Sequence, residues 1–558
     1  MPNTCPFTDS SREIAERFLQ TIVVVDDRAF FYEEERPHTD LKKPGRTTHS
    51  DTGKEADMEQ RDQVKTDTHE LNAKELIDCF AKKGLVCSII RPERASEKLG
   101  PKTIAVSKRA DIVVLDWVIN NVRGEKTLEL IEGITKDDAG MASDNRVRLI
   151  VVYTGEKDLT DIFDTIEERL KTYSPTRVNE LTLKWGTTRI AVYAKEGISV
   201  PAHLKERVIP VHTLPEVLVG EFAEMTMGLL SNFALASFTA IRDNTHRVIT
   251  KFSPHLDAPY LAHRALLDPP EDAESHILPL FVSELESVLK DTKIADCISL
   301  TEIKKWFNCR VMSPVDLYRR MRIRSKEAAF SAMIALIKDG ILKENLSSSY
   351  PRWRHFISPL KDETDKKCLS NLTNVLTLDG KSGERFDKEL AFVMSVDSRY
   401  SSPPPSLRLG TIVAQDEDHK TFYFVCIQPL CDSVRLSNKG RYFPFLKFKL
   451  AAKSVADDFG YIVKDRGLAV ELRLKIRPHD TQQILFKPKP GGKEIRAVMV
   501  NSDWIFSSSE QGTAQFRWIA DLKPAHAQRV VNEFASQISR VGLTESEWLR
   551  RKAKQKSD

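Results

Sequence analysis

Short, nearly continuous runs of Val and Ile in the first 200 residues constrain the fold most strongly. The four clearest runs are 21–25, 111–115, 148–153 and 189–193. A weaker fifth run lies at 85–90. Such runs are typical of parallel strands that helices cover on both faces. Amphipathic helical patterns lie between them, at 71–83, 128–134 and 159–170. The alternation predicts a doubly wound α/β domain with a parallel sheet.

The segment 33–69 interrupts this alternation. It has almost no large apolar residue and is rich in Glu, Asp, Lys, Thr, Arg and Pro. A segment of this composition cannot bury enough apolar surface to offset its ordering entropy. We therefore expect a long mobile insertion after the first strand.

The pattern changes beyond residue 200. Residues 201–360 are mainly helical in character, with a long apolar segment at 214–240 and a helix expected at 325–339. From 372 to 558, strand-like runs alternate with turn residues, at 390–394, 407–413, 421–427, 442–450, 468–476, 483–486 and 497–500. A final helix is expected after Pro524. A chain of 558 residues is long enough for about three domains. We therefore predict an α/β domain at 1–200, a helical domain at 201–360 and a β-rich domain with a C-terminal helix at 372–558.

Charge and cysteine usage exclude several classes of protein. The net charge is +4, from 84 Lys and Arg against 80 Asp and Glu, which gives little attraction for nucleic acid or a membrane surface. The eight cysteines form no CxxC pair, so we expect thiols in a reducing compartment. The N-terminus does not resemble a signal peptide, and no apolar run approaches the ~20 residues that span a bilayer. These features predict a cytoplasmic protein.

Polar residues follow each of the four clearest strands. They are Asp26 and Asp27 after the first, Asp116 after the second, Thr154 after the third and Lys195 shortly after the fourth. Functional groups of parallel α/β sheets gather at the carboxyl ends of the strands, so these side chains should lie together. Three crowded carboxylates need a cation, and Mg²⁺ prefers oxygen ligands. Such a site suits phosphoryl transfer, which depends on positioning and charge neutralisation.

The motifs VVVDD, VVLDW, VVYTG and VYAKEG resemble, in this order, those of response-regulator receiver domains, over about the first 200 residues. The resemblance implies a flavodoxin-like fold and a sensor histidine kinase as phosphoryl donor. It implies that Asp116 accepts the phosphoryl group. Asp26, Asp27, Asp116 and the backbone carbonyl of Val118 would hold Mg²⁺. Thr154 and Lys195 would bind the phosphoryl group.

The chain departs from the family pattern around the fourth strand. Glu196 follows Lys195 where the family usually has Pro. The aromatic switch position, three residues before the Lys, holds Val192, and Tyr193 comes one place later. These departures leave the output switch open. A degenerate receiver that serves as a protein-binding scaffold is the alternative to a working phosphoacceptor.

Other motifs carry weaker signals. The basic run 319–324, the following helix and the aromatic-basic run 350–355 allow a winged helix-turn-helix, although a helical connector with solvated arginines explains them as well. The run 487–493 lacks the spacing of a phosphate-binding loop and is interpreted as a hairpin loop. Cys426 and Cys431 have no base nearby in sequence and are interpreted as structural.

The layout of receiver, helical stretch and β-rich end resembles the receiver proteins of Detocs-type anti-phage two-component systems. In such a system one receiver protein carries a nucleotide-degrading effector, and a second without an enzyme draws phosphoryl groups from the kinase. This chain shows no effector motif after residue 200, so we expect the second role, a phosphate sink without enzyme activity beyond slow self-dephosphorylation. It would compete with the receiver-effector protein. The alternatives are a phosphorylation-controlled DNA-binding regulator and an unrecognised enzyme in the C-terminal region.

Overall fold

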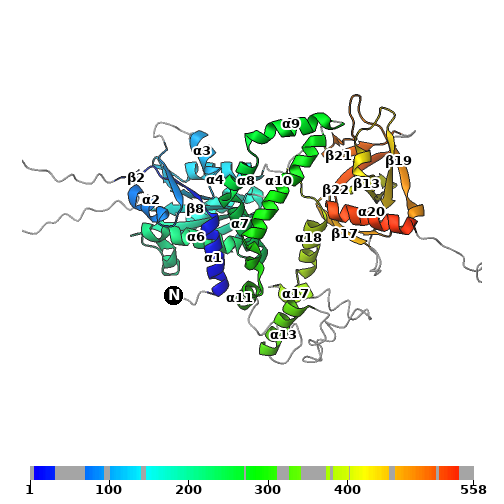
Figure 1. The fold of residues 1–558 in the computed structure, drawn as a ribbon. Coiled ribbons are helices and arrows are strands. Elements are labelled where there is room, and N and C mark those ends of the chain that lie inside the picture. Colours follow the sequence, from blue (N-terminus) through cyan, green and yellow to red (C-terminus); the bar gives the residue numbers. More distant parts are fainter. Residues whose placement is uncertain are drawn as a thin grey trace, which may run out of the picture. The chain divides into compact units, whose positions relative to one another are not determined.

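The computed structural model describes most of the chain, in the ranges 5–31, 70–92, 101–139, 146–268, 270, 272–310, 326–340, 372–377, 381–400, 403–450, 459–509 and 514–539. It divides into two compact units, Met1–Met312 and Ser313–Asp558 (Figure 1). The expected insertion 33–69 and the basic runs 319–324 and 350–355 all lie outside the described residues.

The first unit is built on an eight-stranded, mainly parallel sheet. Its strands are β1 (Thr21–Val25), β4 (Val86–Ile90), β5 (Ile112–Leu115), β8 (Arg148–Thr154), β9 (Thr176–Asn179), β10 (Thr182–Trp185), β11 (Thr188–Lys195) and β12 (Val208–Ile209). The order is β4-β1-β5-β8-β11-β10-β9, and β12 pairs with β11. The five strands from β4 to β11 are parallel, whereas β10 and β9 add an antiparallel hairpin to the edge. The parallel part has the flavodoxin-like strand order.

Helices cover both faces of this sheet. The helices of the first unit are α1 (Pro6–Phe18), α2 (Ala73–Ala81), α3 (Pro101–Ser107), α4 (Glu125–Ala139), α5 (Leu159–Arg169), α6 (Leu214–Thr226), α7 (Leu229–Asp243), α8 (Thr245–Lys251), α9 (Asp257–Leu266), α10 (Asp272–Asp291) and α11 (Leu300–Arg310). Alternate residues of β1 enter two hydrophobic cores: Val23 packs with α4 and α5, and Val24 packs with α1, α2 and α6. Burial of both faces explains why the strands are continuously apolar.

The five predicted strands of the sheet are confirmed as β1, β5, β8, β11 and β4. The helix expected at 71–83 is α2; the Asn72 side chain accepts a hydrogen bond from the Glu75 N–H at 3.1 Å, and Gly84 follows the helix with φ 71°. The apolar segment 214–240 is not one helix, because α6 ends at Thr226 and α7 begins at Leu229. Two short pairs were not predicted: β2 (Ala29–Phe30) with β3 (Leu71–Asn72), and β6 (Val118–Ile119) with β7 (Val122–Arg123).

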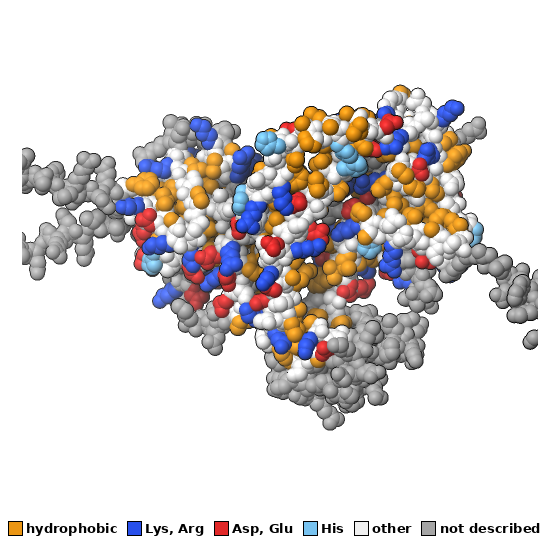
Figure 2. Space-filling model, in the orientation of Figure 1, with side chains coloured by type: hydrophobic (Ala, Val, Ile, Leu, Met, Phe, Trp, Pro, Cys, Tyr) orange, Lys and Arg blue, Asp and Glu red, His pale blue; other side chains and the backbone are white. Residues whose placement is uncertain are grey.

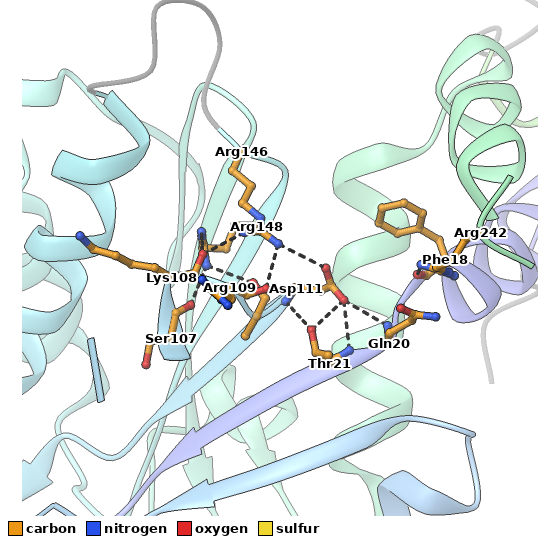
Figure 3. A network of polar contacts seen from close by, with 11 residues as sticks. Phe18, Gln20, Thr21, Ser107, Lys108, Arg109, Asp111, Arg146, Arg148 and Arg242 are labelled. Carbon is orange, nitrogen blue, oxygen red and sulfur yellow. Dashed lines mark hydrogen bonds and ion pairs between the residues drawn. The ribbon is translucent and has the colours of Figure 1, made fainter. Parts of the chain in front are cut away.

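Polar contacts tie the strands together at their amino ends (Figure 3). Arg148 begins β8 and is 0% exposed; its guanidinium donates to the carbonyls of Ser107, Lys108 and Ala110 at 2.8–3.0 Å. The Asp111 carboxylate accepts from the backbone N–H groups of residues 20 and 21 and from the Thr21 hydroxyl, at 3.0–3.1 Å. These contacts fix the end of α3 and the start of β5 against β1 and β8.

Cys5 and Cys309 form a disulfide that joins the start of α1 to α11, with Cα atoms 5.8 Å apart. The expectation that the cysteines stay as thiols is therefore wrong for this pair. Because the partners are 304 residues apart, neither the spacing nor a CxxC motif indicated them. In the described part of the chain, no helix is both long and apolar enough to cross a bilayer.

The second unit is β-rich. Its strands are β13 (Thr411–Glu417), β14 (Lys420–Cys426), β15 (Arg441–Lys447), β16 (Lys449–Leu450), β17 (Phe459–Asp465), β18 (Leu468–Leu474), β19 (Gln482–Phe486), β20 (Val498–Val500), β21 (Asp503–Ser507) and β22 (Gln515–Asp521). They form an antiparallel sheet in the order β19-β15-β14-β13-β22-β21-β20 and a smaller one in the order β16-β18-β17. The Arg517 guanidinium of β22 pairs with the Asp465 carboxylate of β17, which also accepts from the Tyr423 hydroxyl at 2.7 Å.

The helices of the second unit are α13 (Lys326–Asp339), α17 (Leu372–Leu376), α18 (Gly383–Ser395), α19 (Leu430–Ser433) and α20 (Pro524–Ile538). The helix after Pro524 is confirmed as α20. The strand expected at 390–394 is wrong, because these residues lie in α18. A short apolar run of this kind is compatible with a strand and with a helix that has one apolar side. Here the helix packs Phe392 against the core of the second unit.

Candidate functional site at the carboxyl edge of the parallel sheet

Strand register brings all five predicted side chains to one edge of the sheet. Val25 of β1 pairs with Leu115 of β5, so Asp26 and Asp116 follow at the same level. Thr154 ends β8 opposite Ala194 of β11, and Lys195 is the next residue. The strand-end rule therefore predicted correctly that these residues lie at one edge of the sheet.

The Lys195 ammonium lies between two carboxylates. Its Nζ is 2.8 Å from Oδ2 of Asp26 and 2.9 Å from Oδ2 of Asp116. Asp116 is 2% exposed and Lys195 4% exposed, so these charges are largely removed from water. Charged groups at this depth persist only when they are paired. The sequence placed Lys195 beside Asp116, but it gave no sign of the contact with Asp26.

Burial and charge act on this pair together. Burial raises the pKa of the Asp116 carboxyl above its usual range, while the charge of Lys195 acts in the opposite direction. Burial alone would lower the pKa of Lys195, but the charges of Asp116 and Asp26 outweigh it and raise this pKa. Lys195 therefore keeps its proton. A further cation at this edge would favour the ionised form of Asp116.

The Asp27 carboxylate has an oxygen that no hydrogen bond within the described residues satisfies. It is 6% exposed, and its Oδ1 is buried with no hydrogen-bond partner among the described residues. A buried carboxylate oxygen in this state fits a cation ligand, and three acidic side chains suit a hard ion such as Mg²⁺. No three His, Cys, Asp or Glu side chains of the described ranges converge into a metal-binding group, and the Lys195 ammonium lies between Asp26 and Asp116. A metal ion would therefore compete with this ammonium group.

The backbone around Asp116 is held from several sides. Its N–H donates to the Val25 carbonyl at 3.0 Å, and its carbonyl accepts from the Thr127 hydroxyl of α4 at 2.6 Å. Its Oδ1 accepts from the Val118 N–H at 3.4 Å. Thr127 is completely buried, and sequence reasoning missed it. Its place early in a helix that begins shortly after a strand-end Asp was the available signal.

The hairpin after Asp116 sets the position of Val118. β6 and β7 are joined by Asn120 and Asn121, which both have positive φ (55° and 60°), as a tight hairpin turn requires. Gly124 follows with φ 77°, and a Cβ there would lie 2.5 Å from the Trp117 ring. The hairpin thus places Val118, the predicted carbonyl ligand, directly beyond the predicted phosphoacceptor.

The remaining predicted residues lie in different surroundings. Thr154 is buried, and its hydroxyl accepts from the Glu156 N–H at 3.1 Å. Val192 lies in the core beneath α4 and α5, whereas Tyr193 lies on the opposite face and donates to the Glu221 carboxylate of α6. The aromatic side chain displaced by one position thus faces the other side of the sheet, because neighbouring residues of a strand alternate.

Comparisons with known proteins agree with this geometry. Residues 18–200 match the family described as the response receiver domain. This range begins just before β1 and ends just after β11, so it includes all five strand-end residues. No curated protein matched the chain. Residues 18–200 of the chain are therefore similar to a response receiver domain.

Proposed function

We propose that this chain accepts a phosphoryl group on Asp116 from a sensor histidine kinase and acts as a phosphate sink in anti-phage defence. The observation that carries the proposal is the pair formed by Asp116 and Lys195, 2.9 Å apart and buried at the carboxyl edge of a receiver sheet. Asp116 supplies a nucleophilic oxygen, and Lys195 supplies a fixed positive charge beside it.

In the proposed transfer, an Asp116 oxygen forms a bond to phosphorus while the N–P bond of the kinase phosphohistidine breaks. The electron pair of that bond stays on the imidazole. Lys195 offsets the charge of the phosphoryl oxygens, and the Thr154 hydroxyl donates to one of them. Asp26, Asp27, Asp116 and the Val118 carbonyl would hold Mg²⁺, which neutralises the charge that develops between the two reactants.

The sink role is favoured by the organisation of the chain. A receiver sheet is followed by helices in the first unit and by a β-rich second unit, the order that resembles the receiver proteins of Detocs-type systems. We propose that the acyl phosphate on Asp116 is hydrolysed slowly and drives no reaction elsewhere in the chain. The chain would then lower the supply of phosphoryl groups to a competing receiver-effector protein in the cytoplasm.

The test is a competition for one phosphorylated kinase. A radiolabelled sensor histidine kinase is mixed with Mg²⁺ and a second receiver protein, with or without this chain. We expect the wild-type chain to take up label and to reduce labelling of the second receiver. The Asp116→Asn variant should do neither, and the Asp111→Asn variant, at the opposite end of β5, should behave as wild type.

The two parts of the proposal fail in different ways. Label on the Asp116→Asn variant would show that another residue is the acceptor. Label on the wild-type chain without any loss from the second receiver would keep Asp116 as acceptor and reject the sink role.

A further inference from the structure

A pair of histidines lies on the helices that follow the receiver sheet. His263 belongs to α9 and His276 to α10, and the two helices are separated by a short connection. Nε2 of His263 is 3.2 Å from Nδ1 of His276, and the ring centroids are 5.5 Å apart. Figure 2 shows pale-blue histidine atoms among apolar side chains in the region that Figure 1 labels α9 and α10.

The distance between Nε2 of His263 and Nδ1 of His276 is close to the distance between two nitrogen ligands of one metal ion. A Zn²⁺ ion bound by imidazole has Zn–N bonds of about 2.0–2.1 Å, so two nitrogens of a tetrahedral site lie roughly 3.3 Å apart. The 3.2 Å between the two ring nitrogens matches this spacing. In the metal-free chain these two nitrogens share a hydrogen bond, so they face each other, and a bound ion would take the place of the shared proton.

We propose that His263 and His276 form a site for a divalent transition metal of the Zn²⁺, Ni²⁺ or Cu²⁺ class. Imidazole nitrogen suits these ions, whereas Mg²⁺ prefers the oxygen ligands of the site at Asp116. Both histidines are exposed, so an ion can reach them and water can fill its remaining coordination positions. No third His, Cys, Asp or Glu joins them within the described residues, so the protein supplies two ligands.

A bound ion would hold α9 against α10. A salt bridge already links the same helices, with Nη1 of Arg264 at 3.0 Å from Oε1 of Glu274. The Glu274 side chain of this pair is 69% exposed, so the ion pair is screened by water and stabilises the hairpin little. A chelated ion stabilises the paired arrangement more as its concentration rises above its dissociation constant. The region that follows the receiver sheet would therefore respond to transition metals independently of phosphorylation.

The test is calorimetric titration of Ni²⁺ into the full chain, in excess Mg²⁺ that occupies the oxygen site. His263→Gln and His276→Gln should each weaken the tightest Ni²⁺ binding by about tenfold or more. The control is His246→Gln on α8, an exposed histidine of the same unit, which should bind Ni²⁺ as wild type does. The substituted side chains are exposed, and melting in the absence of Ni²⁺ checks that each variant folds.

Electron paramagnetic resonance of the Cu²⁺ complex supplies a second measurement. We expect the signature of two imidazole nitrogens in wild type and of one in either single variant. Unchanged Ni²⁺ affinity in His263→Gln or His276→Gln, or one nitrogen in wild type, would overturn the site. Phosphorylation from acetyl phosphate should be the same in all these variants, so this test does not depend on the proposed function.

Discussion

The two ends of the parallel sheet use charged side chains differently. At the amino end, Arg148 binds three carbonyls, and Asp111 accepts three hydrogen bonds. At the carboxyl end, one ammonium is shared by Asp26 and Asp116, and a buried oxygen of Asp27 has no partner among the described residues. The charged groups at the amino end are satisfied by contacts within the sheet, whereas the carboxyl end contains a buried carboxylate oxygen without such a contact in the described part of the chain.

The largest effect on stability is expected from Arg148→Leu at the amino end. The change leaves three backbone carbonyls without their donor, and each unsatisfied buried group costs about 1–3 kcal/mol. We expect the free energy of unfolding of the first unit to fall by about 3 kcal/mol or more, as measured by urea denaturation. Labelling of Asp116 should persist below the unfolding transition. A variant as stable as wild type would show that the Arg148 contacts are dispensable.

The next effect concerns Lys195→Met at the carboxyl end. Without the ammonium group, Asp26 and Asp116 lose their shared partner and the transferred phosphoryl group loses a fixed positive charge. We expect phosphorylation at saturating Mg²⁺ to slow by roughly a hundredfold. We also expect tighter Mg²⁺ binding by calorimetry, because Lys195 no longer competes for the carboxylates. Lys184→Met, at an exposed position of β10, is the control. Weaker Mg²⁺ binding in Lys195→Met would contradict the competition.

A matched pair of Asp→Asn substitutions gives the smallest effects. In the absence of Mg²⁺, Asp27→Asn removes a buried charge with an unpartnered oxygen, and the free energy of unfolding should rise by about 1 kcal/mol. Asp111→Asn weakens three satisfied hydrogen bonds, and the free energy of unfolding should fall by about 1 kcal/mol. Added Mg²⁺ should stabilise wild type and Asp111→Asn but not Asp27→Asn. Changes of the same sign in both variants would remove the distinction between the two ends.

The sequence predicted the carboxyl end better than the amino end. The strands β1, β5, β8 and β11 have continuous apolar runs, and the polar residue after each run marks a strand end. Arg148 begins such a run, but its spacing gives no indication of the carbonyls that it binds, since these lie about 40 residues earlier, at the end of α3 and just after it. The contact between Lys195 and Asp26 was equally inaccessible, because it depends on side-chain placement across the sheet.

Three short or exposed elements were missed or misassigned because their sequences carry little periodic signal. The β9 strand is exposed at all four positions, so its sequence carries little hydrophobic signal. The β6–β7 hairpin consists of two-residue strands, too short for a periodic pattern. The strand expected at 390–394 lies in a helix because a short apolar run does not distinguish the two structures.

The most direct test of the account is the intact mass of the chain after incubation with acetyl phosphate and Mg²⁺. We expect one phosphoryl-sized mass increase on wild type, none on Asp116→Asn and none on wild type when Mg²⁺ is chelated. An equal increase on Asp116→Asn would contradict the assignment of Asp116. An increase that survived chelation would contradict the metal site at Asp26 and Asp27.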